Sequence, residues 1–136
     1  TPHPQEAARL LGTTTAEVQA DRIDTACKLA QRFHACVVLK GAGSVIAAPG
    51  KTPRWWINPT GNPGMASGGM GDVLTGVLAA LIAQGCSARD AASLASWICG
   101  RAAELAIDDG TSSPESLAAT DVVSRLGAAF NDLRWA

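Results

Sequence analysis

The pattern of apolar positions predicts helices at both ends of the chain and extended segments between them. Residues 4–11 fit a short helix that Gly12 ends. Thr14 and Glu17 then form a capping box, which opens a longer helix. The inner face of that helix is expected to carry Ala20, Ile23, Cys27 and Ala30. Its outer face is expected to expose Asp21, Arg22, Asp24, Lys28 and Arg32 to water.

Short apolar runs in the middle of the chain predict strands. Residues 36–39 and 44–48 are two such runs separated by a glycine turn, and residues 54–57 form a third, more marginal one. Strands that alternate with helices favour a parallel α/β sheet covered on both faces. Trp55 and Trp56 would point to opposite sides of the third strand, so only one of them is expected in the core. Packing at an edge strand is the favoured role of this pair, and a contact surface is the alternative.

Three further helices are predicted at residues 70–84, 88–107 and 120–133, joined by polar turns. The first has the apolar spacing of one buried helix face, made by Val73, Leu74, Val77, Leu78, Leu81 and Ile82. Trp97 and Trp135 are expected on the core faces of the other two helices. A sheet of about three parallel strands would have exposed edges, which indicates that the sequence is the C-terminal part of a larger α/β domain.

Composition narrows the function. The 136 residues suffice for one domain, and 47% of them are hydrophobic. A net charge of −1 offers no basic field for nucleic acid or an anionic membrane, so a small molecule or another protein is the expected partner. The four cysteines lack the spacing of zinc ligands. No signal-like segment opens the sequence, and a cytoplasmic location is therefore expected.

The candidate chemistry lies in residues 61–85, which hold seven of the 14 glycines and one carboxylate, that of Asp72. Gly68, Gly69 and Gly71 precede a helix whose first N–H groups lack partners and carry the positive end of the helix dipole. A phosphate would fit there. Asp72 is either the residue that caps this helix or a catalytic carboxylate, and the spacing alone leaves both roles open.

A second glycine loop follows the strand predicted at residues 36–39 and consists of Lys40, Gly41, Ala42, Gly43 and Ser44. Lys40 would bring a positive charge toward phosphate oxygens, although a β-hairpin turn is the favoured interpretation of this short motif. His3, between two prolines, is expected to be a surface histidine. His34 is expected at a helix end, where the dipole favours it.

Three motifs occur in order along the chain. They are Thr-Pro-His-Pro-x-Glu-x-Ala-Arg-Leu-Leu-Gly at the start, Val-Leu-Lys-Gly-Ala-Gly-Ser in the middle, and then Gly-Asn-Pro-Gly-Met-Ala-Ser-Gly-Gly-Met-Gly-Asp-Val-Leu-Thr-Gly. Together they resemble the ADP- or ATP-dependent NAD(P)H-hydrate dehydratases of the ribokinase-like superfamily. The resemblance implies a Rossmann-like three-layer α/β sandwich, of which residues 1–136 would form only the C-terminal portion, because the family domain is much longer.

The resemblance also implies an activity, in which water is removed from the hydrated nicotinamide ring of NADH or NADPH with ADP or ATP as phosphoryl donor and magnesium present. Asp72 would be the base that takes the ring hydroxyl proton, and His3 would contact the hydrated substrate beside it. Gly69, Met70 and Gly71 would form the anion hole. The nucleotide would lie on Lys40, Gly41, Ala42, Gly43, Ser44 and Gly71. Gln5 stands where the family commonly has glycine, so the segment after His3 is expected to be stiffer than in the family pattern.

No metal ligands can be assigned from the sequence. The resemblance further implies a homo-oligomer, a homotetramer in the family pattern, and an N-terminal epimerase domain or the first half of the domain as an additional part. Two alternatives stay open. One is a ribokinase-like kinase of a vitamin precursor, of the hydroxymethylpyrimidine or hydroxyethylthiazole type, which would share the anion hole and the aspartate. The other is a non-catalytic fragment that binds nucleotide.

Overall fold

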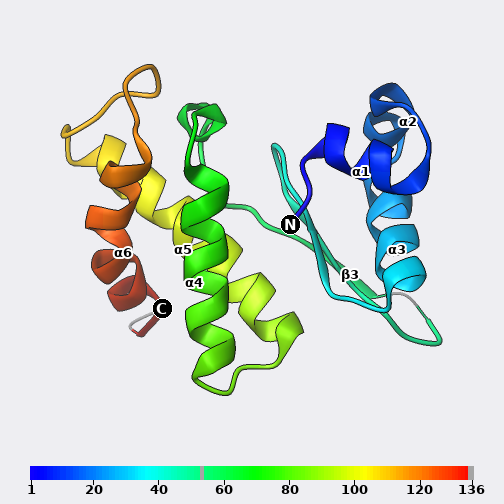
Figure 1. The fold of residues 1–136 in the computed structure, drawn as a ribbon. Helices are drawn as coiled ribbons and strands as arrows, with labels where there is room; N and C mark the ends of the chain where they lie inside the picture. The colour runs from blue at the N-terminus through cyan, green and yellow to red at the C-terminus, as the bar shows by residue number, and fades with distance from the viewer. Residues whose placement is uncertain (53, 135–136) are drawn as a thin grey trace.

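The computed structural model describes residues 1–52 and 54–134, so Trp135 lies outside the described residues. In chain order the elements are α1 (Pro4–Leu11), α2 (Thr15–Ala20), α3 (Arg22–Phe33), β1 (Val37–Leu39), β2 (Val45–Ala48), β3 (Arg54–Ile57), the 3₁₀ helix η1 (Pro63–Ala66), α4 (Met70–Ala83), α5 (Ala88–Asp108) and α6 (Ala119–Arg134). Helices α1 to α3 lie on one side of the sheet, and α4 to α6 lie on the other (Figure 1). This three-layer arrangement confirms the predicted α/β sandwich.

The sheet itself is antiparallel, so the expected parallel sheet is wrong. Its order is β1-β2-β3, with Val38 opposite Ile46 and Ile46 opposite Trp56. The physical reason lies in the connection between β1 and β2, which is residues 40–44. A parallel pair needs a crossover of about a dozen residues or more, whereas a short turn can only join antiparallel neighbours.

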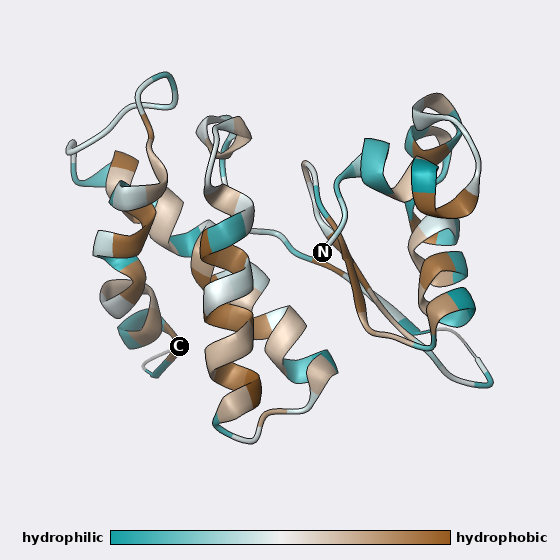
Figure 2. Ribbon diagram, viewed as in Figure 1, coloured by the Kyte–Doolittle hydropathy of each residue, from teal (hydrophilic) through white to brown (hydrophobic). Residues whose placement is uncertain are grey.

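Alternating side chains of the sheet enter two separate cores. Val37, Leu39, Val45 and Ala47 pack with buried residues of α1 to α3 on one face. Val38 and Ile46 pack on the other face with buried residues of α4 and α5. Figure 2 shows the resulting brown strands between the two helical layers. A third core, centred on Ile98 and Val122, joins α5 to α6.

The first helical region differs from its prediction at one residue. Asp21 ends α2 and is also the N-cap of α3, where its Oδ1 accepts a hydrogen bond of 2.9 Å from the Asp24 N–H. One long helix is thus two short ones. The buried residues of α3 are Thr25, Ala26, Leu29 and Ala30, so of the expected inner face only Ala30 is fully buried and Ala20 is exposed. The caps at Gly12, at Thr14 and Glu17, and at His34 are confirmed.

Two apolar segments are less covered than predicted. Within α4 only Leu74 and Leu81 are buried, and a cavity of about 420 Å³ lies between α4 and α6. Trp55 and Trp56 lie in β3, the edge strand of the sheet, as expected, and β3 contacts α3. They are 46% and 36% exposed, so neither is the core residue that the alternation of strand side chains predicted. None of the described helices combines the length and apolar character that a membrane span requires.

Candidate active site

Lys40 lies where the three segments with predicted site residues meet, which are the chain start with His3, the 40–44 loop and the start of α4. It directly follows β1, and its backbone N–H donates a 2.8 Å hydrogen bond to the carbonyl of Pro2. Its Nζ lies 3.9 Å from Oε2 of Glu6 in α1. A β-carbon built on Gly71, in the first turn of α4, would lie only 3.2 Å from the same Nζ. The chain start, the 40–44 loop and the start of α4 therefore meet around one ammonium group.

The start of α4 has the form of an open anion site. Gly69 is the N-cap residue, with a φ of +85° that favours glycine, and it supplies no side-chain hydrogen bond to the helix. Met70 and Gly71 are the first two helical residues. Their N–H groups belong to the first turn, which has no intrahelical acceptors and carries the positive end of the dipole. Beside the Lys40 ammonium, this turn favours a bound phosphate.

Asp72 is the third residue of α4 and is exposed. The helix is capped by Gly69, and the Asp72 N–H donates a 3.0 Å hydrogen bond to the carbonyl of that residue. The interpretation of Asp72 as the capping residue is therefore wrong. Across the described residues, no side chain or backbone group donates a hydrogen bond to the Asp72 carboxylate. The carboxylate is free to accept a proton from a ligand held at the helix start.

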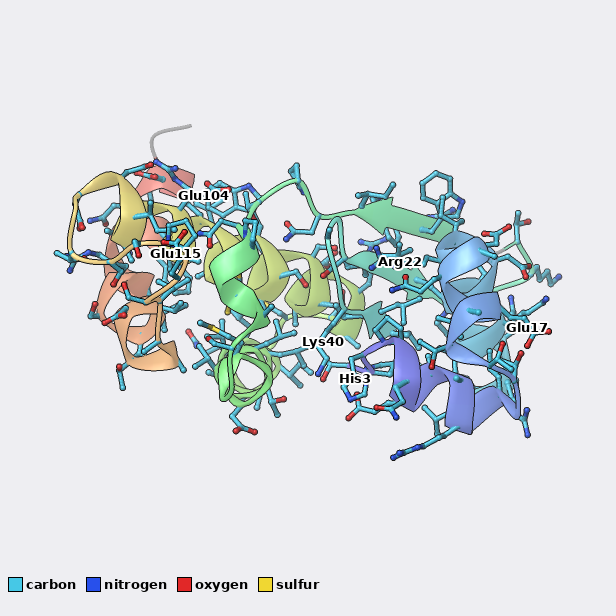
Figure 3. All side chains as sticks on the ribbon, turned by 90° about the horizontal axis from the view of Figure 1, so that it is seen from above. His3, Glu17, Arg22, Lys40, Glu104 and Glu115 are labelled. Atoms are coloured by element: carbon cyan, nitrogen blue, oxygen red, sulfur yellow. The ribbon has the colours of Figure 1, made fainter. Side chains whose placement is uncertain are left out.

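His3 is the N-cap of α1, and its backbone is extended. Its Nδ1 accepts a 3.2 Å hydrogen bond from the Glu6 N–H, and its own N–H donates to Oε2 of Glu6 at 2.6 Å. The hydrogen bond from the His3 backbone is the main reason that the pKa of Glu6 is lowered. Glu6 was missed as a site residue, although it links His3 to Lys40. Figure 3 shows His3 and Lys40 close together in the space between α1 and α4; no direct contact joins His3 to Asp72 in the described residues.

The 40–44 loop is a hairpin turn, which confirms the favoured structural interpretation of this motif. Gly41 has a φ of +148° and Gly43 a φ of +61°. The Ser44 hydroxyl closes the turn, since it donates to the Gly41 carbonyl at 3.1 Å and accepts from the Gly41 N–H at 3.3 Å. A hairpin loop that carries Lys40 at its base is compatible with nucleotide binding.

Arg22 was expected to face water, and this expectation is wrong. Its guanidinium lies under the 40–44 loop, where Nη1 donates to the Ala42 carbonyl at 2.6 Å and Nη2 donates to the Leu39 carbonyl at 3.1 Å. Burial lowers the pKa of this guanidinium from its ordinary value. Helical periodicity could not reveal these contacts, because both partners lie far along the chain.

The segment between β3 and α4 is fixed to α5. Asn58 donates to the Ser96 carbonyl at 3.2 Å, and the Thr60 hydroxyl donates to the Trp97 carbonyl at 3.0 Å. The Gly61 N–H donates to Glu104 at 2.8 Å. These bonds attach the beginning of the glycine-rich segment to α5.

The described residues do not form a metal site by themselves. Within residues 1–52 and 54–134, no three histidine, cysteine, aspartate or glutamate side chains gather in a way that could hold an ion. Magnesium commonly binds through nucleotide phosphates and water with only one or two protein carboxylates. The donor set here therefore does not fit a magnesium ion held by the chain alone.

The sandwich, the glycine cradle at a helix start and the adjacent carboxylate define an α/β protein of the ribokinase-like class. Residues 1–125 match the NAD(P)H-hydrate dehydratase family. The chain belongs to that family.

Curated relatives agree with this assignment. The chain is 52% identical over 104 residues to the bifunctional NAD(P)H-hydrate repair enzyme Nnr of Moorella thermoacetica. The matched region covers 76% of this chain and 19% of that protein. It is 48% identical over 132 residues to the enzyme of the same name from Escherichia coli, covering 96% of this chain and 25% of that protein. It is 48% identical over 105 residues to the ADP-dependent (S)-NAD(P)H-hydrate dehydratase of Neisseria meningitidis, covering 77% of this chain and 35% of that protein.

A solved relative has the same fold. The ADP/ATP-dependent NAD(P)H-hydrate dehydratase from Bacillus subtilis, co-crystallised with ATP and Mg²⁺, superposes with a TM-score of 0.88 at 34% identity. The match covers 96% of this chain and 46% of that chain. The chain thus spans less than half of the length of the solved and curated relatives described above.

Proposed function

We propose that this chain is the C-terminal part of a dehydratase that uses ADP or ATP to remove water from hydrated NADH or NADPH and so restores the cofactor. The observation that carries the proposal is the convergence of Lys40, Gly71 and the His3–Glu6 segment at the start of α4. Family membership and the names of the relatives support the same activity.

The proposed chemistry begins with phosphoryl transfer. Asp72 takes the proton of the ring hydroxyl as that oxygen forms a bond to the terminal phosphorus of the nucleotide, while the phosphorus bond to the rest of the nucleotide breaks. Gly69, Met70 and Gly71 stabilise the charge on the phosphoryl oxygens through backbone N–H groups of the helix start. Phosphate then leaves with the electrons of the carbon–oxygen bond, and loss of a proton from the neighbouring carbon restores the ring double bond.

Substrate binding is divided between the two loops in this proposal. Lys40 and the backbone of Gly41 to Ser44 hold the nucleotide, with Gly71 also in contact with it. His3 contacts the hydrated nicotinamide. Magnesium would accompany the nucleotide phosphates. A homo-oligomer, additional segments such as an epimerase domain, and a cytoplasmic location stay predictions from the sequence.

The identity of the product tests the proposed activity. The protein is mixed with hydrated NADH, Mg²⁺ and either ADP or ATP, and the absorbance of the reduced nicotinamide is followed together with free phosphate. Equal amounts of restored NADH and phosphate are expected. A stable phosphorylated product without phosphate release would instead identify a kinase and refute the dehydratase assignment.

A further inference from the structure

We propose that Arg22 is a positioning residue that holds the 40–44 loop in the shape that binds the nucleotide. This inference deepens the proposed function and rests on it for the identity of the ligand. The loop geometry itself can be tested without any ligand.

The hydrogen bonds of Arg22 bracket the base of the loop. One reaches the carbonyl of Leu39, the last residue of β1, and the other reaches the carbonyl of Ala42 inside the turn. Lys40 lies between these two carbonyls in the chain. Because a guanidinium donates in a fixed planar fork, the two bonds set the path of the backbone on both sides of Lys40.

The loop lies directly on the guanidinium. A β-carbon built on Gly41 would be 2.7 Å from Nη2 of Arg22 and 3.0 Å from Cζ. Gly41 is thus suited to this position by its lack of a side chain as well as by its φ of +148°. Figure 3 shows Arg22 between α3 and the strands rather than on the outer surface.

Arg22 is partly buried, and the position of its guanidinium indicates a role other than solvation. Its Nε is buried and has no hydrogen-bond partner among the described residues. A buried unpaired donor is costly, and a side chain at the first position of α3 could turn toward water instead. The two carbonyl bonds compensate for that cost, and they tie the guanidinium to the loop. Such fixing prepares the Lys40 ammonium and the loop N–H groups before the nucleotide arrives.

The test compares Arg22→Gln and Arg22→Lys with a control, Arg32→Gln, which removes an exposed arginine from the same helix. Hydrogen exchange of the 40–44 segment is measured without ligand, and the Kd for ADP is measured by calorimetry with Mg²⁺ present. Arg22→Gln is expected to speed exchange in this segment and to weaken ADP binding by about tenfold or more. Arg22→Lys should give an intermediate result, because a single ammonium cannot satisfy both carbonyls.

Turnover separates a positioning role from a general loss of structure. In Arg22→Gln the KM for ADP is expected to rise while kcat stays within about threefold, since the hydrogen bonds of Arg22 go to the carbonyls of Leu39 and Ala42 and none goes to Asp72 or to the start of α4. Unchanged exchange in the 40–44 segment would overturn the proposal, and so would equal effects of Arg22→Gln and Arg32→Gln on the Kd. If the complete wild-type protein that contains this chain fails to bind ADP, the proposed function is refuted, and the exchange comparison still decides whether Arg22 holds the loop.

Discussion

Replacing Gly71 with alanine should make the protein more stable and at the same time weaken its binding of nucleotide. Gly71 is the second residue of α4 and has a helical backbone. The one neighbour that a new β-carbon would meet within 4 Å in the described structure is Nζ of Lys40, at 3.2 Å. That atom ends a flexible side chain, so it can retreat without disturbing the fold. The retreat, however, takes the ammonium away from the anion site.

Both effects can be estimated. Alanine in place of glycine inside a helix stabilises a protein by about 0.5–1 kcal/mol, which corresponds to a rise in Tm of about 2–4 °C for a chain of this size. Losing a hydrogen bond from a charged donor costs about 1.5–3 kcal/mol, or roughly ten- to a hundredfold in Kd. Gly127 provides the matched control, because it lies in α6 and a β-carbon there would meet nothing within 4 Å.

The assay combines urea denaturation with a titration of ADP and Mg²⁺. Gly127→Ala is expected to gain stability and to bind ADP as the wild type does. Gly71→Ala is expected to gain stability as well, by somewhat less because it lies in the first turn, and to bind ADP at least about tenfold more weakly. If Gly71→Ala binds ADP as tightly as the control, Lys40 and the helix start do not form one site and the reasoning is refuted.

Two further predictions concern the scaffold. Gly100→Ala should lower the free energy of unfolding by about 1–3 kcal/mol, because a β-carbon there would lie 2.2 Å from Oγ1 of Thr60 and 2.7 Å from the backbone carbon of Thr60. Urea denaturation measures this change, and an unchanged free energy of unfolding would contradict the close packing of Thr60 on Gly100. Hydrogen bonds, first from the Thr13 hydroxyl and then from Thr14, lower the pKa of Glu17 from its ordinary value of 4.5 to about 2. The stability that Glu17 contributes is therefore present above pH 4.5 and lost as the pH falls toward about 2. Glu17→Gln should reduce the pH dependence of the free energy of unfolding in that range. If wild type and Glu17→Gln show the same pH dependence, the hydrogen bonds of Glu17 contribute nothing to stability.

Local signals in the sequence predicted local structure well. The glycine at position 12, the capping box of Thr14 and Glu17, and the three C-terminal helices all lie where short-range chemistry placed them. The error in strand direction was avoidable, since the short connection at residues 40–44 already excluded a parallel pair of neighbours. The division of one helix at Asp21 followed from that residue's preference for the N-cap position.

The contacts that assemble the site could not be predicted in the same way. Arg22 has the spacing of a surface residue, and its partners lie 17 and 20 positions further along the chain. Lys40 and Gly71 are separated by most of the sheet and by the segment that leads to α4. The spacing of apolar residues predicts which face of a helix is buried. It does not predict the contacts of Arg22 and Lys40, because these depend on how the helices and strands pack together. The resemblance to a family supplied the roles of the residues, and the structure supplied the link through Glu6.

The role of Asp72 is the central claim, and α5 offers a matched control for it. Asp90 is also the third residue of its helix and is also exposed, but its carboxylate accepts a hydrogen bond of 2.7 Å from the Ser87 hydroxyl. Asp90→Asn should therefore affect stability and leave turnover intact. Asp72→Asn should leave stability unchanged and abolish turnover, since no described residue donates a hydrogen bond to the Asp72 carboxylate.

The measurement that tests the account most directly is the rate at which the absorbance of reduced nicotinamide returns from hydrated NADH with ADP and Mg²⁺, in wild type, Asp72→Asn and Asp90→Asn. The account predicts that Asp72→Asn loses at least about a hundredfold in rate while its Kd for ADP stays within about tenfold, because the nucleotide is held by Lys40 and backbone groups. Full turnover in Asp72→Asn, or a loss of ADP binding as large as the loss of rate, would contradict it.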